Sequence, residues 1–120
     1  MKSILFGILF SSFIAVGVYA QSAVYFCPDT TSYGYCYGAP EVDQCALDKC
    51  QEYGGTNCQQ IVDCKKKGYG AIALGENSEG AAVIGTSCGF GNLAGAKNEA
   101  VKQCTKYGGI NCQVKNTWNG

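Results

Sequence analysis

Cysteine is the residue type in this sequence with the widest chemical repertoire, and it is abundant. The 120-residue chain has nine cysteines and no histidine. A structural zinc site usually combines closely spaced cysteine pairs with histidine, whereas at least four residues separate neighbouring cysteines here. We therefore expect disulfides, no metal site and no cofactor. The cysteines are Cys27, Cys36, Cys45, Cys50, Cys58, Cys64, Cys88, Cys104 and Cys112.

A repeated phrase predicts two of the disulfides. Residues 50–59 (CQEYGGTNCQ) return as residues 104–113 (CTKYGGINCQ), with the cysteines, tyrosine, glycines and asparagine at a constant offset of 54 residues. In each copy the first cysteine lies in the last turn of a predicted helix, and Gly-Gly then reverses the chain toward the second cysteine. In the first copy we expect Gly54, the residue after the helix, to have a positive φ. We therefore predict the bridges Cys50–Cys58 and Cys104–Cys112.

The predictions for the other five cysteines rest on position alone. Cys36 and Cys88 occupy comparable places in two predicted strands and form the third pair, and Cys27 with Cys64 forms the fourth. Cys45 has no counterpart in the second copy, where a glutamate stands at the same offset. It is therefore the candidate free thiol. Other arrangements of these five cysteines stay open.

The rest of the sequence offers little catalytic chemistry. Without histidine there is no imidazole base for a serine or cysteine nucleophile, and the sequence has no Walker-type phosphate loop. The acidic residues Asp29, Asp63, Glu76 and Glu79 fall in predicted turns or strand ends, so we assign no catalytic residue and expect a protein that is not an enzyme. Two enzymatic alternatives stay open: a small secreted hydrolase with paired carboxylates, and a thiol-active protein that uses an exposed Cys45.

Three tyrosines at every second position are the candidate binding residues. Tyr33, Tyr35 and Tyr37 alternate with Gly34 and Cys36, so a strand places the three rings on one face. In one interpretation the glycine face lets a helix pack closely, and the rings meet a sugar or a protein partner. In the other, which we favour, the rings lie under the helices as core, because tyrosine is often half-buried.

The elements that must position these residues occur twice. Branched and aromatic runs between turn residues predict strands at 23–27, 33–38, 58–64, 69–74, 81–90 and 111–118. Apolar residues at helical spacing predict two helices, each ended by Gly-Gly. The first spans about 40–53, with Pro40 at its first position, and the second spans 93–107, with Asn92 as its cap. Each half then has the order ββαβ. This predicts an α+β fold with a largely antiparallel sheet, two helices on one face of it and disulfide bracing.

The N-terminus predicts export. Residues 1–20 contain a charged Lys2, an apolar stretch and a small-residue ending, which is typical of a secretory signal peptide. Residues 21–120 then form one duplicated domain, with repeat one at about 21–64 and repeat two at about 69–118. We expect a secreted, extracellular protein (periplasmic if bacterial) without a membrane segment after cleavage. Nine basic and nine acidic residues balance, which argues against nucleic acid as a partner.

A set of motifs resembles a known family. The set consists of Tyr35-Cys36-Tyr37-Gly38, Ala46-Leu47 with Cys50, Cys58, Tyr69-Gly70-Ala71-Ile72-Ala73, Phe90-Gly91, Ala100-Val101 with Cys104, and Cys112. Over most of residues 21–118 it resembles the secreted family called domain of unknown function 4189. The resemblance implies an exported, duplicated, disulfide-bearing protein and supplies no activity. The chain departs from the family in having no histidine or arginine and in the extra cysteines Cys27, Cys36, Cys45 and Cys88.

Predicted export, dense bracing and aromatic-rich strands without catalytic groups together favour a binding protein. We expect a small secreted interaction protein of the effector, inhibitor or protector type, whose partner is an extracellular protein or glycan. The alternatives are the hydrolase or thiol-active protein described above, and a structural component of a cell wall or matrix.

Overall fold

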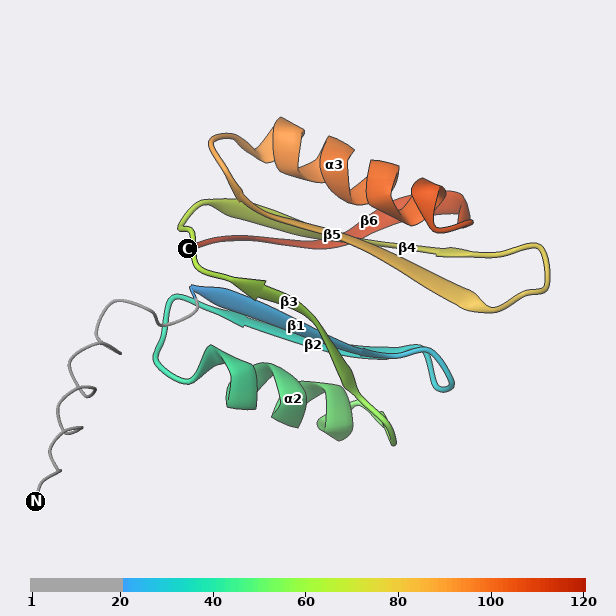
Figure 1. Cartoon of the computed structure of the whole chain (residues 1–120), viewed down its shortest axis with the longest axis horizontal. Helices are drawn as coiled ribbons and strands as arrows, with labels where there is room; N and C mark the ends of the chain where they lie inside the picture. Colours follow the sequence, from blue (N-terminus) through green and yellow to red (C-terminus); the bar gives the residue numbers. More distant parts are fainter. Residues whose placement is uncertain (1–20) are drawn as a thin grey trace, which may run out of the picture.

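The computed structural model describes residues 21–120, so the predicted signal peptide at residues 1–20 lies outside the described residues. Six strands and two helices follow the order ββαβ twice (Figure 1). They are β1 (Ser22–Cys27), β2 (Ser32–Tyr37), α2 (Val42–Glu52), β3 (Gln59–Cys64), β4 (Tyr69–Glu76), β5 (Ala82–Phe90), α3 (Leu93–Lys106) and β6 (Ile110–Asn119). Each predicted strand and helix is present, with its ends within two residues of the prediction.

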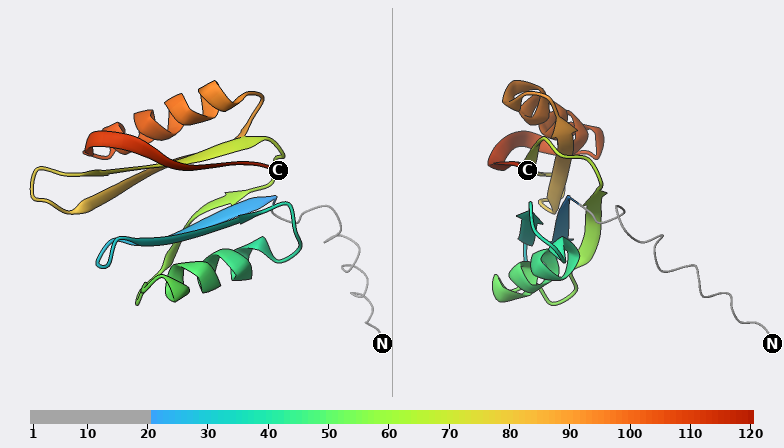
Figure 2. Two further views of the ribbon diagram at one scale, coloured as in Figure 1. Left: turned by 180° about the vertical axis from the view of Figure 1, so that it is seen from behind. Right: turned by 90° about the vertical axis from the view of Figure 1, so that its left-hand side faces the viewer.

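The strands form two three-stranded antiparallel sheets, where the sequence suggested one sheet. The strand order is β2-β1-β3 in the first sheet and β5-β4-β6 in the second. Helix α2 covers the outer face of the first sheet and α3 covers that of the second, while the inner faces of the sheets meet (Figures 1 and 2). The two ββαβ units therefore stack as four layers, in the order helix, sheet, sheet, helix.

Glycine sets the distance between each helix and its sheet. A side chain at Gly34 of β2 would overlap the backbone of α2, and one at Gly85 of β5 would overlap the backbone of α3. Glycine in the middle of a strand usually marks such a close approach of another backbone. The buried helix residues that face the strands are Val42, Ala46 and Cys50 in α2, and Ala96, Ala100 and Cys104 in α3.

Larger side chains fill the space between the two sheets. Val24 of β1, Ile72 of β4 and Trp118 of β6 are buried there. Side chains of a strand alternate between its faces, so each sheet presents one set to its helix and another to the opposite sheet. Each sheet carries buried apolar residues on both faces, and stacking buries the second set. Partly buried residues that pack against this inner core are Tyr33, Tyr35, Val62, Ile84 and Cys88.

Both helices end in the same turn. At the end of α2, the N–H groups of Gly54 and Gly55 donate to carbonyls of the last helical turn at 3.0 and 2.9 Å, which is the bond pair of a Schellman motif. Gly54 has a φ of 103°, as predicted for the glycine after the helix. Gly108 and Gly109 repeat this turn after α3. A side chain at Gly55 would overlap the sulfur of Cys58, so the second glycine makes room for a disulfide.

Candidate functional site

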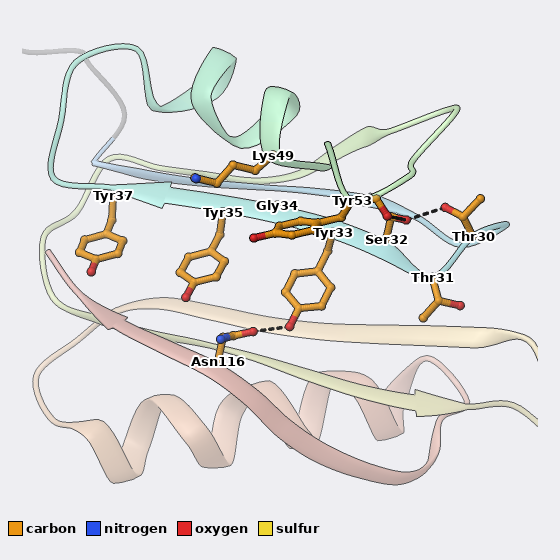
Figure 3. Close-up of a pocket in the computed structure, with 10 residues that line it drawn as sticks. All are labelled: Thr30, Thr31, Ser32, Tyr33, Gly34, Tyr35, Tyr37, Lys49, Tyr53 and Asn116. Atoms are coloured by element: carbon orange, nitrogen blue, oxygen red, sulfur yellow. Dashed lines mark hydrogen bonds between the residues drawn. The ribbon is translucent and has the colours of Figure 1, made fainter. Parts of the chain in front are cut away.

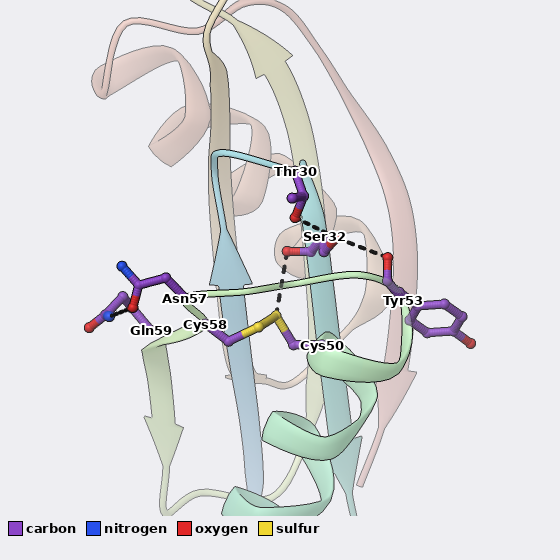
Figure 4. The surroundings of a disulfide bond; sticks show 7 residues. All are labelled: Thr30, Ser32, Cys50, Tyr53, Asn57, Cys58 and Gln59. Atoms are coloured by element: carbon purple, nitrogen blue, oxygen red, sulfur yellow. Dashed lines mark hydrogen bonds between the residues drawn. A yellow bond between two sulfur atoms is a disulfide. The ribbon is translucent and has the colours of Figure 1, made fainter.

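Four disulfides brace the described residues, and two of them are the bridges that the repeated phrase predicts. Cys50 is bonded to Cys58, and Cys104 is bonded to Cys112. Each bridge connects the last turn of a helix to the start of the following strand, as Figure 4 shows for the first unit. The other two bridges are Cys36–Cys45 and Cys64–Cys88.

Cys45 is not a free thiol, and the predicted pair Cys36–Cys88 is wrong. Cys36 in β2 points toward α2 and is bonded there to Cys45, near the start of the helix. This bridge ties strand to helix within the first unit. The thiol-active alternative that used an exposed Cys45 is wrong for the same reason.

A shift of one residue explains why Cys88 does not match Cys36. Gly34 and Gly85 are equivalent, because each contacts its helix backbone at positions that lie 54 residues apart. The counterpart of Cys36 is therefore Ser87, whose hydroxyl donates to a carbonyl of α3 at 2.6 Å. Cys88 lies on the opposite face of β5 and packs into the inner core, since successive strand residues alternate between faces.

The predicted pair Cys27–Cys64 is wrong because the two residues lie at opposite ends of the β1–β3 ladder. Cys64 is paired with Ser22 at the start of β1, whereas Cys27 ends that strand. At the strand rise of ~3.4 Å per residue, they are about 17 Å apart, beyond the reach of a disulfide. Cys64 is bonded instead to Cys88 of β5, so this bridge connects the two units. Among the described residues, Cys27 is the free cysteine.

Hydrogen bonds stabilise the thiolate form of Cys27. The hydroxyl of Thr30 and the N–H of Asn57 lower the pKa of Cys27 from its ordinary value of 9.0 to about 6, and burial opposes this shift. A thiol with such a pKa is nucleophilic at neutral pH if reagents can reach it. The Cys27 side chain has no exposed surface, so we assign it no chemical role in the folded protein.

A cavity of about 530 Å³ runs along the outer edge of β2 and contains the three candidate tyrosines. Its lining comes from β2 and the turn before it, from the C-terminal part of α2, and from β6 (Figure 3). We call this cavity the tyrosine cleft. It is lined by Thr30, Thr31, Ser32, Tyr33, Gly34, Tyr35, Tyr37, Lys49, Tyr53 and Asn116.

The three tyrosine rings face the second sheet, so the interpretation that places them under the helices is wrong. The glycine face of β2 packs closely against α2, as the other interpretation predicts. The Tyr33 hydroxyl donates to Oδ1 of Asn116 in β6. The ring centroids of Tyr35 and Tyr37 lie 5.4 and 6.5 Å from that of Trp118. Tyr33 and Tyr35 are half-buried, and Tyr37 is 45% exposed. The rings thus form a wall that is held in place on one side and open on the other.

The end of α2 supplies the other wall of the cleft. Lys49 and Tyr53 line it on the helix side of β2, and the Tyr53 side chain is 67% exposed. The hydroxyl of Ser32 donates to the carbonyl of Tyr53 at 3.0 Å, which attaches the helix end to the strand (Figure 4). Burial raises the pKa of Tyr33, so its hydroxyl remains a donor at neutral pH.

The backbone of β2 is open along the cleft. β2 is an edge strand that pairs with β1 alone. Residues of an antiparallel strand alternate between hydrogen-bonded and non-bonded pairs, and the N–H of Gly38 donates to the carbonyl of Gln21 at 3.0 Å. Because the register between β1 and β2 is unbroken, the N–H and C=O groups of Tyr33, Tyr35 and Tyr37 point away from β1, toward the open edge.

The duplication places a second cleft at the equivalent edge of the other sheet. It measures about 350 Å³. Gln103 and Tyr107, which lie 54 positions after Lys49 and Tyr53, both line it. Its two β5 residues, Ile84 and Thr86, flank Gly85 in the way that Tyr33 and Tyr35 flank Gly34 of β2. The same scaffold therefore carries a second, more aliphatic cleft. This β5 cleft is lined by Ile61, Ile84, Thr86, Gln103 and Tyr107.

The sequence analysis missed six lining residues of the tyrosine cleft and the ring that packs behind it. The lining residues are Thr30, Thr31, Ser32, Lys49, Tyr53 and Asn116, and the ring is that of Trp118. Tyr53 had a signal, because a tyrosine follows each helix in the repeated phrase, and an apolar ring that recurs at a helix end need not belong to the core. Asn116 and Trp118 had none. Their role depends on β6 facing β2 across the inner core, which is set by the stacking of the sheets.

Within residues 21–120, no group of three cysteine, aspartate or glutamate side chains is placed to hold a metal ion. No helix in this part of the chain has the length and apolar character needed to cross a bilayer. The lining of the tyrosine cleft includes no aspartate or glutamate among the described residues. The chemistry of the cleft is therefore that of aromatic rings, hydroxyls, one amide and one ammonium group.

Fold and bridges together define a small, cysteine-rich α+β protein with two similar ββαβ units. A family model with the description domain of unknown function (DUF4189) matches residues 19–119, and the chain belongs to this family. The resemblance seen in the motifs is thereby confirmed. No curated protein and no solved structure matches the chain.

Proposed function

We propose that the protein is a secreted binding protein that holds an extracellular partner, a protein segment or a glycan, in the tyrosine cleft. The observation that carries the proposal is the cleft itself: about 530 Å³, four tyrosines and an open rim on a braced scaffold. Four disulfides suit an oxidising extracellular environment, and the predicted signal peptide supplies a route to it.

The composition of the cleft suits recognition. Tyrosine combines a large apolar ring with a hydroxyl that bonds to polar ligands, which is why it is enriched at binding sites. Tyr33 and Tyr35 are already held by Asn116 and Trp118. A ligand therefore meets a wall whose side chains need little further ordering, and binding loses less conformational entropy.

Hydrolysis of a polymer has less support. Glycoside hydrolysis usually requires two carboxyl groups on either side of the scissile bond, and the lining residues of the tyrosine cleft in the described chain include none. The single charged side chain of the cleft, Lys49, orients a ligand more readily than it activates water.

The test is to screen the full-length mature protein against two defined probes: an array of extracellular-matrix and cell-wall glycans, and a phage-displayed library of random linear peptides. Tyr53→Ala removes an exposed ring without a role in the core. We expect wild-type protein to retain a subset of one probe and Tyr53→Ala to bind the same members at least about fivefold more weakly, because truncating an aromatic hot spot costs more than about 1 kcal/mol.

Tyr107→Ala is the matched control, since Tyr107 follows α3 as Tyr53 follows α2 and is 65% exposed against 67%. It should bind as wild type does. Two results contradict the proposal: no member of either probe is retained, or Tyr53→Ala and Tyr107→Ala bind equally well. Near-ultraviolet circular dichroism of each variant establishes that its tertiary structure is unchanged.

A further inference from the structure

We propose that the tyrosine cleft takes an extended polypeptide segment, which adds to β2 as a fourth strand of the first sheet and places an acidic side chain beside Lys49. This inference rests on the proposed function and names the class of partner. Four observations carry it: the open edge of β2, the spacing of its free backbone groups, the walls on both sides of that edge, and the charge of the cleft.

The cavity follows the edge of β2 and does not lie over one face of the sheet. Its lining includes consecutive residues of this strand, Ser32 through Tyr35, whose side chains alternate between the two faces. A cavity bounded by both faces of one strand lies beside its backbone. A ligand in the tyrosine cleft therefore meets the peptide groups of β2 as well as its side chains.

The free backbone groups of β2 have the spacing that a partner strand requires. Tyr33, Tyr35 and Tyr37 point their N–H and C=O groups away from β1, as the register with β1 implies. Alternate residues of a strand lie about 6.8 Å apart, twice the ~3.4 Å rise. An added strand presents its own donors and acceptors at this interval, which is the mode of recognition known as β-augmentation.

The side chains around the edge provide pockets for the added strand. On the inner side, alternate side chains of an added strand would lie beside the rings of Tyr33, Tyr35 and Tyr37, since same-face neighbours on adjacent strands contact one another. On the helix side, Gly34 contributes no side chain, and the space beside it is bounded by Lys49 and Tyr53. The added strand therefore meets aromatic rings on one face and a cation on the other.

The charge of the cleft selects an acidic segment. Lys49 is its single charged lining residue. The one salt bridge of the described residues joins Lys65 to Asp63, so Lys49 forms no salt bridge within residues 21–120. A carboxylate of the partner that faces α2 would meet this ammonium group at the rim of the cleft.

A glycan and a second copy of this chain fit the edge less well. A glycan has no regular series of donors and acceptors at strand spacing, so the free peptide groups of β2 would stay with water. A second copy paired through its own β2 would bring the two Lys49 side chains toward one interface, to which the cleft contributes no carboxylate. Both remain outcomes that the experiment distinguishes.

The experiment measures amide hydrogen exchange by NMR on the mature protein, alone and with a peptide selected from the displayed library. In the free protein we expect rapid exchange at Tyr33, Tyr35 and Tyr37 and slow exchange at Gly34 and Cys36. A bound strand should slow exchange at the three tyrosine amides by at least about tenfold, because their N–H groups become hydrogen-bonded. Two versions of the peptide carry N-methyl groups on alternate amides, one on the odd-numbered and one on the even-numbered residues. The version whose methyl groups replace the N–H groups that face β2 should bind at least about tenfold more weakly, and the other version should lose much less affinity.

Lys49→Gln tests the acidic contact, since glutamine is the residue at the equivalent position 103. We expect affinity for an acidic peptide to fall about two- to fivefold, in line with an exposed ion pair, and the selected peptides to be enriched in aspartate and glutamate. Unchanged affinity, with no such enrichment, overturns the charge assignment.

Three results would overturn the strand addition. Glycans retained in a Tyr53-dependent manner, with exchange at Tyr33, Tyr35 and Tyr37 unaffected, would leave the proposed function intact and exclude the peptide. Protection of these amides that rises with protein concentration alone would identify a second copy as the occupant. Selected peptides that bind without slowing exchange at β2 would place their site elsewhere. If neither probe is retained, the proposed function itself fails.

Discussion

The bridge between Cys64 and Cys88 makes a prediction that can be worked from the structure. It is the one disulfide of the described residues that connects the two ββαβ units, and its cysteines are 24 residues apart in sequence. In the chain-entropy model, closing a loop of this length stabilises the folded state by about 3.5 kcal/mol at 25 °C. The double variant Cys64→Ala/Cys88→Ala removes the bridge without leaving a free thiol, so we expect it to lose about that much stability.

The assay is equilibrium unfolding in urea, together with thermal denaturation followed by circular dichroism. For a domain of about 100 residues, a loss of 3.5 kcal/mol corresponds to a fall in Tm of about 14–28 °C. The matched control is Cys104→Ala/Cys112→Ala, whose cysteines are 8 residues apart. The same model gives about 2.6 kcal/mol for that shorter loop, so the inter-unit variant should be the less stable of the two.

A loss below about 1 kcal/mol for Cys64→Ala/Cys88→Ala would refute the reasoning, because the denatured chain would then gain little freedom from the missing bridge. Non-reducing peptide mapping of the wild-type protein provides an independent check. A peptide that links Cys88 to Cys36 or to Cys27 would contradict the stacking of the sheets, since Cys88 lies in the inner core and Cys36 faces α2.

Three further predictions concern single residues. Gly34→Ala should destabilise the fold by about 1–3 kcal/mol, because the added methyl group overlaps the backbone of α2 at Ala46; urea unfolding measures it. Asn92→Ala should cost about 1 kcal/mol, because Asn92 Oδ1 accepts the N–H of Gly95 at 2.7 Å and caps α3; a midpoint equal to that of the wild type would contradict this. Cys27 has a folded pKa of about 6 against an ordinary 9.0, so its contribution to stability is fully present above pH 9 and is lost as pH falls toward 6. The free energy of unfolding of the wild type, relative to that of Cys27→Ser, should therefore be larger at about pH 9 than at about pH 6. A difference independent of pH would show that the thiol does not ionise in this range.

Local structure was predictable because its signals are local. Strand boundaries followed from turn residues and β-branched runs. The Gly-Gly pair after each helix predicted the end of the helix and the bridge that follows it, and Gly54 has the positive φ that was expected. Asn92 was predicted as a cap and accepts the expected hydrogen bond. Pro40, in contrast, was expected at the first position of α2, whereas the helix begins at Val42 with Glu41 in the left-handed region before it.

The arrangement of the two units was not predictable in the same way. A repeat of ββαβ is compatible with one sheet or with two, and the choice depends on whether the face opposite the helix is apolar. Tyrosine does not decide this, because its ring suits a core and its hydroxyl suits a surface. The wrong pairs Cys36–Cys88 and Cys27–Cys64 followed from that uncertainty, since a one-residue difference in β5 reverses the face on which a cysteine lies.

The duplication gives this molecule two copies of one support and only one copy of the tyrosine edge. The glycine turn, the helix-end bridge and the glycine beneath each helix are the same in both units, whereas Tyr33 and Tyr35 are matched by Ile84 and Thr86. Side chains at the two rims can therefore diverge without loss of the framework beneath them. A chain built in this manner can acquire a new specificity at one rim while the other keeps its original ligand.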